Sequence, residues 1–156
     1  MDPRLFDAVI EFHLSQGNDY TSNMLEPSYP DGLDVEVFRF ECLKNAWQEA
    51  TLPSQREHVT LFIYEQSQRF QIGSFKGEND LSSHRWTVDE PEDFELVSRI
   101  YKALYPQNPF FTMDDVLGLI DSQPDLKAIN AKFERNEGLK KSQERDADFL
   151  EKGRGD

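Results

Sequence analysis

Five acidic residues crowd into the segment "RWTVDEPEDFELV", residues 85–97: Asp89, Glu90, Glu92, Asp93 and Glu95. The segment starts as a strand-like apolar run and continues as a helix opened by Pro91. Acids in a first helical turn interact favourably with the helix dipole, by about 0.3–1 kcal/mol each, which accounts for Glu92 and Asp93. Asp89 lies just outside that turn. Because ligands of open α/β sheets bind beyond the carboxyl ends of strands, Asp89 is a candidate magnesium ligand, with helix capping as the alternative.

Two further groups of polar residues are candidates for contact with a ligand. Asp34 and Glu36 share the polar face of a predicted strand, and this face either meets solvent or lines a pocket for a hydroxyl-rich ligand such as a sugar. Arg56 and Glu57 lie in the first turn of a helix within "SQREHVT", residues 54–60. Glu57 either faces a ligand or completes a capping box with Ser54.

Several other chemistries find no support in the residue pattern. The histidines lack metal-ligand spacing with Cys42, and neither a GxSxG elbow nor a GxGxxG or GK[ST] phosphate loop occurs. The net charge of −13 argues against nucleic acid as a partner, whereas a divalent cation can still bring a small anion to an acidic site. A single cysteine, no basic leader and no apolar run of about 18 residues predict a cytoplasmic protein without a membrane span.

The elements that position these residues alternate between strand and helix. We predict strands over 19–23, 33–40, 69–75 and 84–88, and helices over 3–16, 41–50, 54 onward, 91–104, 113 onward and 126–133. Asp2 and Gly17 supply the start and stop of the first helix. This order predicts an α/β layered fold with a largely parallel or mixed sheet.

Apolar spacing also predicts which helix faces are buried. The expected buried residues are Phe6, Val9, Ile10, His13 and Leu14 in the first helix, Val59, Phe62 and Ile63 in the helix from Ser54, Phe94, Val97, Tyr101 and Leu104 in the helix from Pro91, and Met113, Val116, Leu117 and Ile120 in the helix that Thr112 and Asp115 cap. After residue 134 the composition becomes highly charged, which is typical of a solvated helix or a disordered tail.

The segments "YPDGLDVEVF", "SQREHVT" and "RWTVDEPEDFELV" resemble the carboxyl-terminal half of the sugar-nucleotide cytidylyltransferases. The resemblance is greatest to the spore-coat polysaccharide branch, which is related to CMP-Kdo and CMP-sialate synthetases. It covers residues 1–139, including "NPFFTMDDV" and "INAKFERNEGL".

The resemblance implies a partial Rossmann-like nucleotide-diphospho-sugar transferase fold with a mixed sheet. It also implies a reaction in which a sugar hydroxyl attacks the α-phosphate of CTP, with Mg²⁺, to give a CMP-sugar and pyrophosphate. Asp89 falls on one of the two metal-binding acids of the family, and Asp34, Glu36, Arg56 and Glu57 would face the acceptor sugar. The catalytic residues themselves remain unassigned.

The family's triphosphate-binding loop and its second metal-binding Asp would precede "DPRLF", so we expect this chain to be inactive alone, without the CTP-binding half. We expect residues 1–106 to form the acceptor-side half of the domain, 107–139 a helical extension packed on it, and 140–156 a charged tail. A homodimer is the expected assembly. The alternatives are a non-catalytic interaction or dimerisation module, and a glycosyltransferase of related fold.

Overall fold

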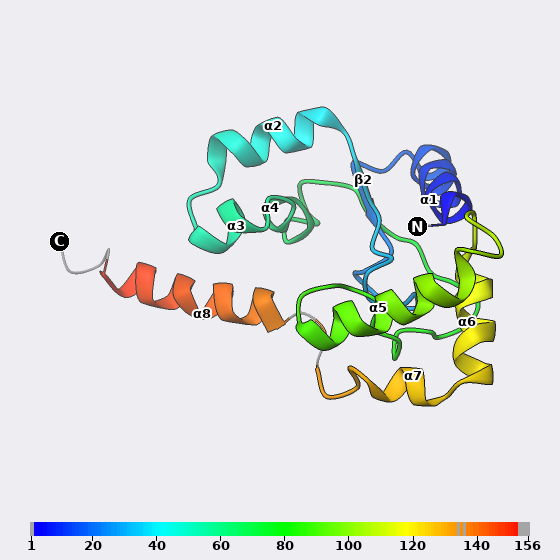
Figure 1. Cartoon of the computed structure of the whole chain (residues 1–156). Helices are drawn as coiled ribbons and strands as arrows, with labels where there is room; N and C mark the ends of the chain where they lie inside the picture. Colours follow the sequence, from blue (N-terminus) through cyan, green and yellow to red (C-terminus); the bar gives the residue numbers. More distant parts are fainter. Residues whose placement is uncertain (1, 134, 136, 153–156) are drawn as a thin grey trace.

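A small mixed sheet separates two groups of helices (Figure 1). The computed structural model describes residues 2–133, 135 and 137–152. Within them, β1 (Tyr20–Ser22) lies at the centre of the sheet, antiparallel to β2 (Glu36–Phe38) and parallel to β3 (Ile72–Ser74). The expectation of an α/β fold with a mixed sheet is therefore confirmed.

The first helix, α1 (Pro3–Gln16), has the caps that the sequence predicts. The Asp2 carboxylate accepts a hydrogen bond from the Arg4 amide at 3.1 Å, and Gly17 ends the helix with φ of 67°. Its buried residues are Leu5, Val9 and His13, which lie one turn apart along the helix.

The predicted stripe of α1 is partly wrong, because Ile10 is 41% and Leu14 is 72% exposed. Leu5 and Val9 pack against Val35, with Leu33 and Val37 beside them, so the apolar side of the segment 33–37 faces α1. The period-2 alternation predicted for this segment is thus confirmed, although the ladder itself is shorter than predicted.

The opposite face of the sheet is covered by α2 (Phe40–Glu49) and α4 (Leu61–Tyr64). The cluster between them and the sheet comprises Tyr20, Cys42, Ala46, Ala50, Phe62, Ile63 and Phe70. A separate apolar cluster joins α5 (Pro91–Leu104), α6 (Met113–Ser122) and α7 (Asp125–Ala128), and it comprises Leu96, Ile100, Val116, Ile120 and Leu126.

The predicted limits of α5 are confirmed, and its predicted buried face is partly wrong: Leu104 packs against this cluster as predicted, but two of the four residues are exposed. Phe94 is 66% and Tyr101 is 48% exposed, while Asp93, Leu96 and Ile100 are buried. Asp93 points inward to Arg85 on the face that carries Leu96 and Ile100, a face that hydrophobic spacing fits equally well. For α6 the predicted cap is confirmed, since the amide of Asp115 donates to the Thr112 hydroxyl and Val116 and Ile120 are buried.

The helix predicted from Ser54 is two short helices, α3 (Pro53–Glu57) and α4, separated by a turn. Val59 in that turn has a φ of 43° and is 46% exposed, so its predicted burial is wrong. The predicted capping box of Ser54 and Glu57 is also wrong, because α3 begins one residue earlier and both side chains bond elsewhere.

Residues 84–88 do not form the predicted strand and make only an isolated parallel bridge between Asp31 and Arg85. The Asp31 amide donates to the His84 carbonyl at 2.9 Å, and the Trp86 amide donates to the Asp31 carbonyl at 2.7 Å. The segment that carries Asp31 then turns at Gly32, whose φ is 96° and whose position beside Thr87 leaves no space for a side chain. The pairing therefore stops where the loop at Gly32 turns away from residues 86–88.

The charged tail is helical as α8 (Glu137–Lys152), which lies alongside α3 (Figure 1). Residues 153–156 of the predicted tail lie outside the described residues. No helix within the described part of the chain has the length and apolar character needed to cross a bilayer.

Candidate functional site

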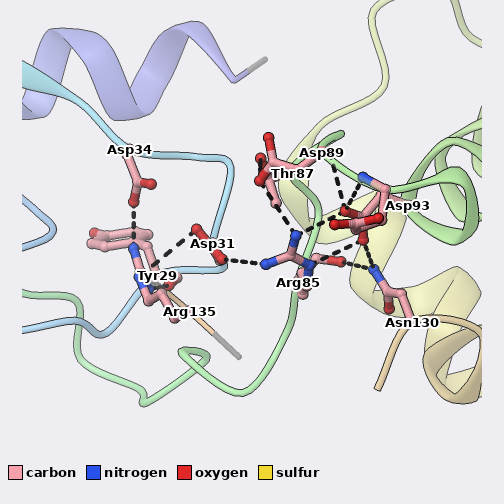
Figure 2. A network of polar contacts seen from close by, with 10 residues as sticks. Tyr29, Asp31, Asp34, Arg85, Thr87, Asp89, Asp93, Asn130 and Arg135 are labelled. Atoms are coloured by element: carbon pink, nitrogen blue, oxygen red, sulfur yellow. Dashed lines mark hydrogen bonds and ion pairs between the residues drawn. The ribbon is translucent and has the colours of Figure 1, made fainter. Parts of the chain in front are cut away.

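Two arginines and four aspartates from distant parts of the chain form one polar network (Figure 2). The aspartates come from the loop before β2, from the segment that leads into α5 and from α5 itself. The arginines are Arg85 and Arg135, and the aspartates are Asp31, Asp34, Asp89 and Asp93. Since four carboxylates face two guanidinium groups here, the network as described carries an excess of negative charge, which favours a cation.

Asp93 is the buried anchor of this network. Its carboxylate accepts from Arg85 Nε at 3.0 Å and Nη2 at 2.8 Å, and from the Asn130 amide at 2.8 Å. The backbone amides of Asp89 and Glu90 donate to it at 3.1 Å each, so Asp93 caps α5. Burial raises the pKa of Asp93, but the hydrogen bonds from Arg85, Asn130 and the two amides outweigh burial and hold the pKa well below its usual range.

Asp31 links the two arginines. Its carboxylate lies 3.5 Å from Arg85 Nη1 and 3.8 Å from Arg135 Nε, and Arg135 also binds Asp34 and the carbonyl of Tyr29. Burial raises the pKa of Asp31, opposed by Arg135 and Arg85. Asp34 and Asp89, predicted from separate patterns, therefore belong to one network through Asp31 and the arginines.

Asp89 is the exposed member, with 67% of its side chain accessible. Its Oδ2 lies 3.3 Å from Arg85 Nη2 and 3.3 Å from the Thr87 hydroxyl. Asp93 takes the amide hydrogens of residues 89 and 90, so the Asp89 carboxylate is not used in capping. The capping alternative thus describes Asp93 and not Asp89.

The donor set fits magnesium only in part. Mg²⁺ in nucleotide sites is typically held by one or two carboxylates together with substrate phosphates. One exposed carboxylate in an acidic network meets the protein's part of that requirement. Among the residues that the structure describes, however, no group of three or more His, Cys, Asp or Glu side chains could hold a metal ion. Asp89 alone would supply a single ligand, and its metal role stays a prediction.

Glu36 belongs to a different network, on the face of the sheet that α4 covers. It accepts hydrogen bonds from the Tyr20 hydroxyl and, at 2.7 Å, from the Thr60 hydroxyl. Burial and the neighbouring Glu36 raise the pKa of Tyr20 far above its usual range, so this phenol stays a donor. The structure does not place Glu36 among the contacts of Asp34, and its binding role stays a prediction.

Arg56 and Glu57 extend from α3 in different directions. Arg56 Nη1 donates to the Trp47 carbonyl at 2.9 Å, whereas Glu57 accepts from the Ser142 hydroxyl at 2.9 Å and lies 3.5 Å from Arg145 Nη1. The Glu57 carboxylate is therefore bound by side chains of α8. The sugar-binding roles predicted for both residues stay predictions.

The turn after α3 is strained. Val59 is a β-branched residue in the left-handed region, a conformation that costs about 1–3 kcal/mol and persists only where its surroundings hold it. The Nε2 atom of His58 is buried without a hydrogen-bond partner among the described residues. The Thr60 hydroxyl, one residue further, reaches Glu36.

A cavity of about 310 Å³ lies between the loop at Gly32, the segment 86–88, α5 and α6. Trp86, Tyr101 and Phe111 contribute to its mainly apolar lining. A mainly apolar lining offers few hydrogen-bond partners to a hydroxyl-rich ligand.

Sequence reasoning missed Asp31, Arg85, Asn130 and Arg135. The spacing of Arg85 from Asp89 and Asp93 was visible in "RWTVDEPED", and it would have indicated an ion pair. Arg135 gave no such signal, because it meets Asp34 only after 101 residues of intervening sequence.

The comparisons with known proteins identify the class to which this fold corresponds. A cytidylyltransferase from Leptospira borgpetersenii serovar Hardjo-bovis superposes with a TM-score of 0.74 and 25% identity, over 81% of this chain and 53% of that one. The fold is thus that of a nucleotide-diphospho-sugar transferase, as predicted.

Sequence relatives give the more particular assignment. The chain is 32% identical over 131 residues to the uncharacterized protein MJ1063 of Methanocaldococcus jannaschii, covering 81% of this chain and 51% of that protein. It is 26% identical over 133 residues to the spore coat polysaccharide biosynthesis protein SpsF of Bacillus subtilis, covering 80% and 52%. No protein-family model matches. The chain is thus similar to a cytidylyltransferase and to a spore coat polysaccharide biosynthesis protein, and it spans about half the length of the relatives it matches.

Proposed function

We propose that this chain is the carboxyl-terminal, acceptor-side part of a cytidylyltransferase that transfers CMP from CTP to a sugar acid or related sugar for polysaccharide biosynthesis. The match to half of a cytidylyltransferase fold carries the proposal. Asp89 would hold Mg²⁺, which screens phosphate charge and orients the triphosphate for attack. The network with excess negative charge and the exposure of Asp89 support this role.

The acceptor sugar would be bound by four residues, Asp34, Glu36, Arg56 and Glu57. A carboxylate has about four acceptor sites, so Asp34 and Glu36 can bind a sugar hydroxyl and keep their present partners. The arginine and tyrosine contacts of these two acids fix their orientation before a ligand arrives. Such preorganisation lowers the entropic cost of binding.

The 156-residue polypeptide alone is proposed to be inactive, because its match covers only about half the length of each relative. Titration calorimetry of magnesium and CTP against this polypeptide should give no micromolar binding. Tight binding that Asp89→Asn abolishes would contradict this part of the proposal and leave the metal role of Asp89 intact.

Transfer of CMP is tested in a fusion that places the amino-terminal half of the Bacillus subtilis relative before residue 2. Pyrophosphate release from CTP, with Kdo and N-acetylneuraminate among the acceptors, should appear in the fusion and not in either half. Asp89→Asn should lower the rate by about 100-fold, because a lost metal ligand removes several kcal/mol of transition-state stabilisation. Glu90→Gln changes the adjacent exposed acid and serves as the matched control. Equal rates for the two variants would refute the metal role.

We also propose a homodimer in the cytoplasm. Phe40 and Trp47 of α2 are 73% and 71% exposed, which provides apolar surface for association. Cys42 is buried and has no disulfide partner, in agreement with a reducing compartment. Sedimentation equilibrium should give twice the monomer mass, and Trp47→Ser should shift the equilibrium toward monomer. A monomer at all concentrations would contradict the proposed homodimer.

A further inference from the structure

The α8 helix binds α3 at both of its ends. At the start of α3, the Ser54 amide donates to Asp146 Oδ1 at 2.9 Å, and the Ser54 hydroxyl bonds the other oxygen of the same carboxylate. At its end, Glu57 accepts from Ser142 and pairs with Arg145. The two helices therefore lie side by side (Figure 1).

Asp146 of α8 acts as the amino-terminal cap of α3, a role that a residue next to the helix fills in most helices. Leu52 occupies the cap position of α3 and has no side-chain oxygen to accept the first amide hydrogens. The carboxylate of Asp146, 92 residues away in sequence, accepts one of them instead. The short helix α3 therefore depends on a cap that α8 supplies.

The interface between the two helices is polar. None of the described α8 residues belongs to the apolar clusters that hold the sheet and the other helices together. Phe149 and Leu150 of α8 remain 50% and 48% exposed. An interface made of side-chain hydrogen bonds and one exposed ion pair opens at a lower free-energy cost than an apolar core.

The α8 helix binds one residue of the proposed acceptor site, Glu57. Glu57 is engaged by α8, and α3 leads directly into the strained turn at Val59 and from there to Thr60, the hydrogen-bond partner of Glu36. We propose that α8 is a detachable clamp that holds α3 in place and occupies Glu57, so that its release opens the acceptor side. The acceptor part of this statement rests on the proposed function, whereas the clamp itself does not.

Hydrogen–deuterium exchange of the full 156-residue chain tests the clamp. Asp146→Ala should raise exchange of the backbone amides of residues 54–61 by about fivefold or more, the effect of removing a helix cap. Asp148→Ala removes the next acid of the same helix and is the matched control, because Asp148 is exposed and, among the described residues, neither a hydrogen bond nor an ion pair joins it to α3. Exchange over α5 and α6 should be equal in both variants, which excludes global unfolding as the cause.

Trypsin supplies a second measurement, because Arg56 lies within α3. Cleavage after Arg56, followed by mass spectrometry, should be several times faster in Asp146→Ala than in Asp148→Ala. Equal exchange and equal cleavage in the two variants would overturn the clamp, whatever the fusion enzyme does. If the clamp opens as expected but the fusion makes no CMP-sugar, only the proposed function fails.

Discussion

Replacing Asp93 by asparagine should destabilise the protein strongly although it leaves the shape of the side chain unchanged. Asp93 is fully buried and is the bidentate partner of Arg85, whose side chain is only 13% exposed. Asparagine keeps one acceptor oxygen but turns an NH₂ group toward donors that already point at this position. Removing one member of a buried ion pair typically costs about 3–5 kcal/mol, because the other charge stays buried.

Several contacts determine where this loss falls within that range. Arg85 keeps Asp31 at 3.5 Å and Asp89 at 3.3 Å, so its charge is not left entirely uncompensated. The amides of residues 89 and 90 lose their charged cap at the same time. We therefore expect about 3 kcal/mol, or a decrease in Tm of roughly 6–12 °C for a chain of this length.

Urea unfolding followed by tryptophan fluorescence measures the change, because Trp86 packs against the cluster that α5 helps to form. Asp89→Asn is the control, since Asp89 is two-thirds exposed and its ion pair should contribute less than about 1 kcal/mol. If the two variants differ by less than 1 kcal/mol, the division into a buried structural acid and an exposed functional acid is wrong.

Three further predictions concern the scaffold. The Arg4 hydrogen bond lowers the pKa of Asp2 to about 2, so Asp2→Ala should lower the free energy of unfolding in urea by about 2 kcal/mol at pH 7. The carboxylate stabilises the fold above about pH 4 and loses this effect as the pH falls through about 2, so the difference in unfolding free energy between variant and parent should narrow on acidification. Asp114→Ala, at the exposed partner of Arg4, should show little change at either pH. Gly32→Ala should lower the unfolding free energy by about 2 kcal/mol or more, because the backbone there has a φ of 96° and a Cβ would lie 2.5 Å from the Thr87 nitrogen. Gly118→Ala, in open space within α6, should instead raise the unfolding free energy by about 0.5–1 kcal/mol. Val59→Gly should raise the Tm slightly, by relief of about 1 kcal/mol of backbone strain, whereas Val88→Gly, at a similarly exposed valine without positive φ, should lower it.

Local sequence signals predicted the elements well wherever the determinant lay within a few residues. Asp2 with Pro3, Gly17, Pro91 and Thr112 fix helix ends through their own backbone and side-chain chemistry, and the structure places those ends as predicted. The α/β order followed from the same signals.

The predictions failed where a distant partner decides the conformation. Arg85 binds Asp93 on the buried face of α5, and Asp146 replaces the local cap that Ser54 was predicted to provide. Residues 84–88 have the composition of a strand, yet they can pair only as far as the loop at Asp31 runs beside them. Periodicity contains no information on any of these partners.

The acids between residues 89 and 95 divide into three physical roles that composition alone does not separate. Asp93 is buried and takes the two backbone amides and Arg85, which holds the segment in one conformation. Glu92 and Glu95 pair with Lys132 and Arg99 at the surface. Because these contacts satisfy the helix start and fix the backbone, Asp89 is left exposed on a rigid support, and a carboxylate in that situation can exchange its weak 3.3 Å contacts for a cation without disturbing the fold.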